Sequence, residues 1–231
     1  NEDYSCALGQ TISYGHIGNQ LIFKSNLQKD LSIEDSSTIE RFRKHFAMYS
    51  TATFYGVHRT AFMKKIFLAS SQNTTDYIFG EYLMTLLTII EGKLKVFDSL
   101  FSVRMLHDPL KLRNHNFYTY IMNGTFDSEY AKFKKCLSEV LSTKANISNE
   151  EAPAIVDQAL IEHFNNQGLS LDTLRKKAKI KGYLSQIGIL EPLLKMKRKI
   201  IPTKFKTYQD FLNQPDVPYF DTSHPDHDEF M

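Results

Sequence analysis

Residues 76–97 read DYIFGEYLMTLLTIIEGKLKVF, and this stretch decides the fold class. Its first part is apolar on almost every side and ends at Glu91 and Gly92, where glycine is a common helix terminator. A helix of this kind is normally packed between other layers of a protein. The alternating residues 93–97, and then residues 100–103, predict two strands that follow it. The sequence therefore predicts an α/β protein with a mixed sheet.

Further elements are predicted on both sides of this stretch. Before it, strands are expected at residues 19–23 and 50–55, helices at 36–46 and 61–68, and a polar loop at 70–75. After Pro109 helical spacing recurs and no strand is indicated; the expected helices are 130–141, 154–164, 171–180 and 191–200. The second half of the chain is therefore expected to be an α-helical elaboration.

The composition is that of an ordinary globular protein. Of the 231 residues, 42% are hydrophobic and 23% are charged, which excludes a disordered chain, a collagen-like repeat or a coiled-coil rod as a description of the whole. The cysteines, Cys6 and Cys136, match no metal-ligand or redox spacing, so reduced thiols are expected. The longest apolar run, residues 77–90, is shorter than the roughly 20 residues of a membrane-spanning helix, and no such helix is predicted.

Charge is distributed unevenly along the chain. The formal net charge is only +2. Residues 174–206, however, carry eleven lysines and arginines against the single acid Glu191, and the acidic tail at 207–231 is expected to be irregular. The basic stretch has two interpretations: a solvated face that covers a helical core, or a docking surface for anionic lipid or nucleic acid.

Asp76 is the first candidate catalytic residue. It stands at the start of the buried helix and follows a polar loop, where the positive end of the helix favours a carboxylate and a substrate hydroxyl can approach. Aspartate at this position is also a routine helix N-cap. The two roles do not exclude each other.

Glu81 is the second candidate, because it is a carboxylate inside an otherwise apolar helix. It either faces the same cleft as Asp76 or is paired with a buried partner such as Arg104 or Arg59, since an unpaired buried charge would cost several kcal/mol. The second alternative makes Glu81 part of a structural ion pair.

A predicted strand end supplies two more candidates, Arg104 and His107. An imidazole at a strand end can complete a divalent-metal site, and a guanidinium can hold a phosphate or a carboxylate. The same residues are compatible with an ordinary surface or core position.

The phrase TFYGVHR, residues 53–59, supplies the candidate substrate contacts. Gly56 permits close backbone approach, as a substrate loop needs, and it is flanked by Tyr55, His58 and Arg59. The structural alternative is a buried strand followed by the polar start of a helix.

Taken in order, the phrases ATFYGVHRT (52–60), DYIFGEYL (76–83), GKLKVF (92–97) and VRMLH (103–107) resemble the later half of a GT-A glycosyltransferase domain of the family 2 type, and most closely a bacterial subgroup of it. The resemblance covers about residues 4–110. It implies an incomplete GT-A-like mixed sheet: an acceptor-side half at residues 1–110, the helical elaboration at 111–206 and the irregular acidic tail at 207–231.

The resemblance also implies roles for the candidate residues. In this family an acidic motif at the start of a helix supplies the catalytic base of inverting transfer, and here that position is Asp76. Thr75 stands where a preceding acid is common, which leaves open whether Asp76 or Glu81 is the base. By position His107 is implied as a metal ligand, and Arg104 as a contact to diphosphate or acceptor.

GT-A enzymes bind the nucleotide-sugar donor through an N-terminal βαβ half that ends in an Asp-x-Asp metal motif. Neither feature precedes Tyr4, so both are expected upstream of Asn1, and the chain alone is expected to be inactive. The divalent metal, Mn²⁺ or Mg²⁺, is expected to be held mainly by that upstream motif. The implied partners are a nucleotide-sugar donor and a hydroxyl acceptor, either a glycan or a lipid-linked molecule.

The implied compartment is the cytoplasm, with peripheral contact at the inner face of the membrane, and no nucleic acid is expected. A different class of function is the alternative: a non-catalytic binding module that uses residues 174–206 on an anionic membrane surface or on nucleic acid. A third possibility is a degenerate transferase-like domain that serves as a scaffold.

Overall fold

The computed structural model describes residues 3–17, 20–26, 31–49, 52–105 and 117–187. These residues fall into two compact units. The first unit lies within Asn1–Gly9, Gln28–Asp98 and Gly124–Leu171, and the second within Gln10–Leu27, Ser99–Asn123 and Asp172–Met231. All the helices around the candidate catalytic residues belong to the first unit.

The sheet is built around β1 (Tyr4–Ile17). It pairs antiparallel with β2 (Gln20–Asn26), from Thr11 opposite Asn26 to Ile17 opposite Gln20. It also pairs antiparallel with the short β3 (Val57–His58), and β4 (Lys93–Met105) pairs with it as well. The predicted α/β class is therefore confirmed, and so is the strand expected at residues 19–23.

Two strand predictions needed correction. The strand expected at residues 50–55 is wrong: Thr53–Tyr55 forms a 3₁₀ helix, η1, closed by a hydrogen bond from Gly56 N to Thr53 O, and the strand that follows has two residues. Burial of Thr53 overrides the β propensity of this aromatic segment. The two strands expected at 93–97 and 100–103 are one continuous strand, β4.

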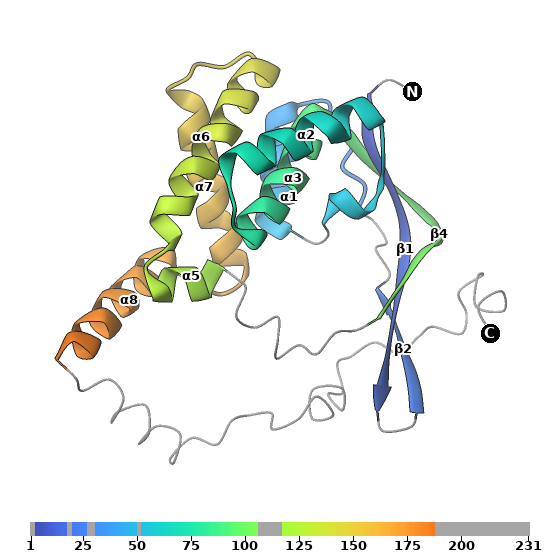
Figure 1. Cartoon of the computed structure of the whole chain (residues 1–231). Helices are drawn as coiled ribbons and strands as arrows, with labels where there is room; N and C mark the ends of the chain where they lie inside the picture. Colours follow the sequence, from blue (N-terminus) through green and yellow to red (C-terminus); the bar gives the residue numbers. More distant parts are fainter. Residues whose placement is uncertain (1–2, 18–19, 27–30, 50–51, 106–116, 188–231) are drawn as a thin grey trace. The chain divides into compact units, whose positions relative to one another are not determined.

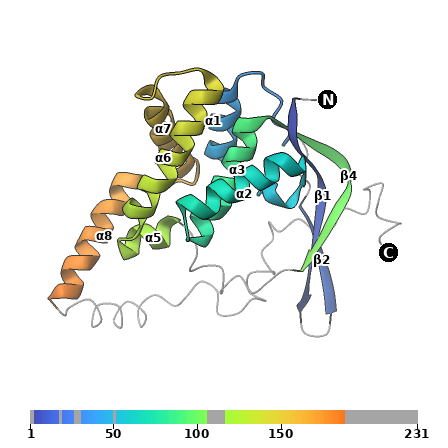
Figure 2. The same cartoon turned by 45° about the horizontal axis from the view of Figure 1, so that its top comes forward.

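The helices of the first unit are α1 (Thr38–Met48), α2 (Thr60–Asn73), α3 (Tyr77–Glu91), α6 (Phe126–Ala145) and α7 (Glu151–Asn166). Helix α3 contacts α1, α2, α6 and η1, and α7 covers α1 and α6 (Figures 1 and 2). Residues 77–90, which are apolar on almost every side, thus form a helix packed between other helices, as predicted. Helix α2 runs on to Asn73, so most of the loop predicted at 70–75 is helical.

Two more helices are described towards the end of the chain. Helix α5 (Phe117–Asn123) was not predicted, because a helix of this length shows little periodicity. Helix α8 (Leu171–Gln186) confirms the helix expected at 171–180. The helix expected at 191–200 and the tail at 207–231 lie outside the described residues.

An aromatic core joins the helices of the first unit. Phe133 of α6 lies 6.1 Å from Phe46 of α1 and 5.5 Å from Phe79 of α3, measured between ring centroids, and both pairs meet edge to face. All three rings are fully buried. Residues on both sides of position 110 therefore share one core. The predicted boundary at this position, between an acceptor-side half and a helical elaboration, stays a prediction.

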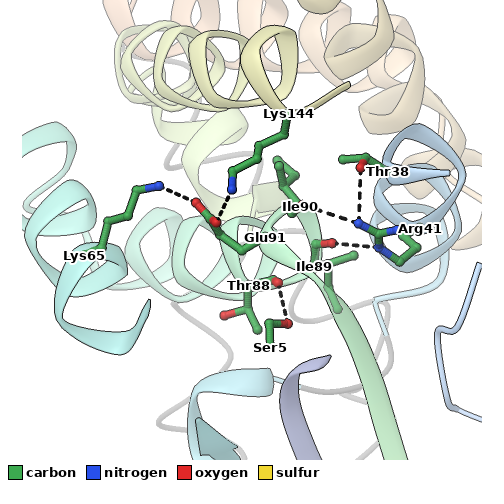
Figure 3. A network of polar contacts seen from close by, with 9 residues as sticks. All are labelled: Ser5, Thr38, Arg41, Lys65, Thr88, Ile89, Ile90, Glu91 and Lys144. Atoms are coloured by element: carbon green, nitrogen blue, oxygen red, sulfur yellow. Dashed lines mark hydrogen bonds and ion pairs between the residues drawn. The ribbon is translucent and has the colours of Figure 1, made fainter. Parts of the chain in front are cut away.

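The C-terminal end of α3 is held by buried Arg41 (Figure 3). Its guanidinium donates to the carbonyls of Ile89 (3.2 Å) and Ile90 (3.5 Å), and on its own side to those of Asp35 and Ser36, both at 2.9 Å. The last carbonyls of a helix have no partner within the helix. Arg41 supplies partners for two of them.

Glu91 forms a second attachment at the same end of α3. Its carboxylate side chain is 2% exposed and is bonded by Lys65 of α2 and by Lys144 of α6, the latter at 2.6 Å (Figure 3). Burial raises the pKa of Glu91, but the hydrogen bonds and charges of Lys144 and Lys65 outweigh it, so the pKa is lower than usual. From β1, the hydroxyl of Ser5 donates to Thr88 O at 2.8 Å.

Candidate functional site

Asp76 is the N-cap of α3. Its Oδ1 accepts a hydrogen bond from the backbone N–H of Phe79 at 2.9 Å, which confirms the capping role predicted for this residue. The turn before it is fixed by Thr74, whose Oγ1 accepts from Asp76 N at 3.0 Å and donates to Glu129 of α6 at 3.2 Å. The Asp76 side chain is only half-buried. A carboxylate has two oxygens, so a single cap bond leaves it with further acceptor capacity.

Glu81 is partnered by tyrosines. Its Oε1 accepts a hydrogen bond from the hydroxyl of Tyr49 at 3.2 Å. Arg59, one of the two partners considered from the sequence, instead donates to the carbonyl of Tyr4 at 3.4 Å. The carboxylate of Glu81 is therefore held by neutral phenols rather than by Arg59.

Tyr77 lies next to both Glu81 and Tyr55. Burial, and then the charge and polar contacts of Glu81 and Tyr55, raise the pKa of Tyr77 to about 12. Both rings remain open to solvent, with Tyr77 58% and Tyr55 45% exposed. Tyr77 thus lies near two residues that were predicted as site residues, Tyr55 and Glu81. Tyr77 itself was not predicted, although the i, i+4 spacing from Glu81 on a helix could have indicated it.

Tyr49 is a second residue near Glu81 that was not predicted. It is the C-cap of α1 with φ of 23°, a backbone conformation that L-residues rarely adopt. Its ring stacks on Tyr82 of α3 at 3.7 Å between centroids. Burial, followed by the charge of Glu81, raises the pKa of Tyr49, so its hydroxyl stays a proton donor to that carboxylate. Nothing in the local sequence marks Tyr49, because the contact arises from the packing of α1 on α3.

His58 and Gly56 have structural surroundings. His58 Nε2 donates to Thr53 O at 2.7 Å, and burial lowers the pKa of the imidazole, which favours its neutral form. A Cβ on Gly56 would lie 2.6 Å from the sulfur of Cys6 and 2.7 Å from Ala7 O. The close approach predicted for Gly56 is therefore made by β1 of the chain itself.

Two candidates, Arg104 and His107, have no described position relative to this group. Arg104 is an exposed residue of β4 and belongs to the second unit. His107 lies outside the described residues. Among the residues that the structure does describe, no group of three or more His, Cys, Asp or Glu could hold a metal ion. The divalent-metal site, expected mainly upstream of Asn1 with His107 as a further ligand, stays a prediction.

A cavity of about 610 Å³ lies elsewhere in the first unit, along α6 and the start of α7. Its lining includes Tyr130, Lys134 and Ser138, and none of the site residues predicted from the sequence. Tyr130 and Lys134 both bond the carboxylate of Asp157, at 2.8 and 2.6 Å. The candidate site is thus the group of side chains at the N-terminal end of α3, and this cavity is separate from it.

Comparison of the chain with family models, with curated proteins and with solved structures finds no match. Within the described ranges, no helix is both long enough and apolar enough to cross a membrane.

Proposed function

We propose that this chain provides the acceptor side of a glycosyltransferase. The observation that carries the proposal is the position of a half-buried carboxylate, Asp76, as the N-cap of the buried helix whose first turns carry Tyr77 and Glu81, with Tyr55 near Tyr77. The residues of this group occur within two phrases of the sequence, 52–60 and 76–83, on which the resemblance to GT-A enzymes of the family 2 type rests.

The chemistry of the group suits an alcohol such as a sugar. Two phenol rings, Tyr55 and Tyr77, are exposed and offer flat surfaces on which the apolar face of a sugar ring can pack. Hydroxyl and carboxylate oxygens next to them can bond the hydroxyl groups of the same ring. Sites of this type combine apolar and aromatic surface with a few well-placed polar groups.

Asp76 is the better candidate for the base, and Glu81 for a positioning role. An oxygen of Glu81 already accepts a hydrogen bond from the hydroxyl of Tyr49, and Tyr77 lies near the same carboxylate. Asp76 accepts one cap hydrogen bond, through Oδ1, so the carboxylate can still take the proton of a substrate hydroxyl. In this assignment Glu81 fixes the tyrosine hydroxyls, and Asp76 acts on the substrate.

In the proposed reaction Asp76 removes the proton of an acceptor hydroxyl. The resulting oxygen forms a bond to the anomeric carbon of the nucleotide-sugar, and the bond from that carbon to the nucleoside diphosphate breaks. When bound, a divalent metal would neutralise charge on that leaving group. The donor and the metal belong to the half of the domain that the proposal places before Asn1.

The test is an assay of nucleoside diphosphate release by the protein that includes those preceding residues, with Mn²⁺, a panel of nucleotide-sugars and hydroxyl acceptors. Asp76→Asn should lower kcat by at least about 100-fold, the usual contribution of a general base. Asparagine caps helices as well as aspartate does, so the fold should be unaffected, with an unchanged circular dichroism spectrum and unfolding midpoint.

Asp172→Asn is the matched control, because Asp172 is an exposed acid in the first turn of another helix, α8. It should keep the kcat of the parent. The proposal fails if Asp76→Asn turns over at the rate of the parent, or if the preceding sequence has no Asp-x-Asp motif following a buried strand.

A further inference from the structure

One face of helix α8 packs against other residues of the second unit, to which α8 itself belongs. Leu174 is buried there, with 3% of its surface exposed. One and a half to two turns further on, Lys181 Nζ donates to the carbonyl of Met122 at 3.2 Å and contacts Asn123 Oδ1 at 3.4 Å, both in α5. This face is therefore fixed by contacts within the protein.

The opposite face of α8 carries exposed apolar side chains. Ile180, Tyr183 and Ile187 have exposed fractions of 59%, 63% and 46%. They are three and four residues apart, and the last turn is completed by a hydrogen bond from Ile187 N to Tyr183 O at 3.2 Å. At 100° per residue all three lie in one narrow stripe. A stripe of this kind is not expected on a helix face whose only role is to be solvated.

Lysines surround this stripe. Lys176, Lys177 and Lys179 are all exposed. The helical repeat places Lys176 in line with the apolar stripe, and Lys177 and Lys179 on either side of it. The outer face of α8 is thus both apolar and cationic.

We propose that the outer face of α8, defined by Lys176, Lys177, Lys179, Ile180, Tyr183 and Ile187, docks on an anionic lipid bilayer. Basic amphipathic helices lie in the plane of the membrane interface with their apolar side chains at the boundary between headgroups and acyl chains. The lysines then meet lipid phosphates, and the phenol of Tyr183 lies at the level of the headgroups. This inference does not depend on the proposed transferase activity.

Nucleic acid is the other polyanion that could attract these lysines. Contacts to phosphates require cationic and polar groups and would leave three apolar side chains facing a charged backbone. A bilayer accommodates the lysines and the apolar stripe together. The observations therefore favour the membrane.

The chain contains no tryptophan, which allows a direct test. Tyr183→Trp places a single indole on the outer face of α8, and its emission should shift to the blue when vesicles of phosphatidylcholine with about 30% phosphatidylserine are added. Vesicles of phosphatidylcholine alone should give a much smaller shift. Phe67→Trp is the matched control, since Phe67 is a similarly exposed apolar residue (51%) on α2; its emission should not change.

Charge and apolar contributions can be separated by flotation with the same vesicles. Replacing Lys176, Lys177 and Lys179 together by Gln should weaken binding by about 100-fold, at roughly fivefold per lysine. The double change Ile180→Ser and Ile187→Ser should weaken it at least about tenfold without altering the charge. The control removes the same charge from the first unit, by Lys64→Gln, Lys132→Gln and Lys135→Gln, and should leave binding unchanged.

Three outcomes would overturn the inference. The first is the absence of a blue shift of Tyr183→Trp with phosphatidylserine vesicles. The second is equal binding to phosphatidylcholine alone. The third is tighter binding to duplex DNA or RNA that survives the two isoleucine changes, which would assign this face to nucleic acid. Circular dichroism spectra that match the parent show that each variant is folded.

Discussion

The two ends of α3 hold polar side chains in different ways. At the C-terminal end Arg41 and Glu91 are buried, and each is bonded by several protein groups. At the N-terminal end Asp76 is half-buried with one cap bond, and Tyr77 beside it is largely exposed. Polar groups whose hydrogen-bonding capacity is used up by other protein groups stabilise the fold. Polar groups that keep exposure and bonding capacity are available to a ligand.

The largest effect is expected from Arg41→Met. The change removes the donor to the carbonyls of Asp35 and Ser36 and to those of Ile89 and Ile90, and the last two are buried. The free energy of unfolding should fall by about 3–5 kcal/mol. Denaturation in urea, followed by circular dichroism, measures it.

Arg43→Met is the control for this change. Arg43 lies on the same helix but is 41% exposed, and it pairs with Glu162 at 2.9 Å. Its loss should cost less than about 1 kcal/mol. Equal costs for the two arginines would contradict the structural role given to the C-terminal end of α3.

Glu91→Gln should have the next largest effect. The variant keeps the shape of the side chain but loses the charge between Lys65 and Lys144, two lysines that can rehydrate because both are partly exposed. The expected loss at about pH 7 is roughly 2 kcal/mol, the value of hydrogen bonds to a charged group.

The effect of Glu91→Gln should also depend on pH. The pKa of Glu91 is lowered in the folded protein from its ordinary value of 4.5, so the carboxylate stabilises the fold above that value. This stability is lost as the pH falls from 4.5 through the lower pKa of the folded state. Unfolding curves of parent and variant should therefore converge on acidification. A difference that stays constant in this range would contradict the pairing.

Two glycines of the same helical segment give a smaller contrast. A Cβ on Gly92 would lie 2.8 Å from Asp3 O and 2.9 Å from Ser5 N, whereas on Gly80 it would meet nothing closer than 3.6 Å. Gly92→Ala should cost about 1–3 kcal/mol. Gly80→Ala should be neutral or stabilise the helix by up to about 1 kcal/mol. The unfolding midpoints of the two variants measure the contrast, and a reversal of their order would refute it.

The smallest effect on stability is expected at Asp76. Asp76→Ala removes the cap bond to Phe79 N and should cost about 1 kcal/mol, while Asp76→Asn keeps a cap of equal quality. The difference between the free energies of unfolding of the two variants gives the contribution of the cap bond. A large loss in Asp76→Asn would mean that the charge of Asp76 is needed for folding, contrary to the role proposed for it.

The elements that could be predicted are those with a local signal. The apolar run of α3, the cap at Asp76 and the stop at Gly92 are all encoded within residues 76–92, and the strand at β2 has an apolar run of its own. Periodicity and capping need no knowledge of distant residues.

The features that could not be predicted depend on contacts distant in sequence. The segment at 53–55 became η1 because tertiary packing overrides its β propensity. Tyr49 reaches Glu81 across 32 positions of the chain, and Gly56 lies against Cys6 and Ala7 of β1, about 50 positions away. A single sequence carries no sign of which residues will meet in this way.

The central claim is that the N-terminal end of α3 serves a ligand and its C-terminal end serves the fold. The most direct test is the rate of nucleoside diphosphate release by Asp76→Asn and by Gly92→Ala, measured with the protein that includes the proposed donor half. Asp76→Asn should unfold like the parent and release at least about 100-fold more slowly. Gly92→Ala should be less stable, and below its unfolding transition it should release at the rate of the parent. Parental release by Asp76→Asn would contradict the account.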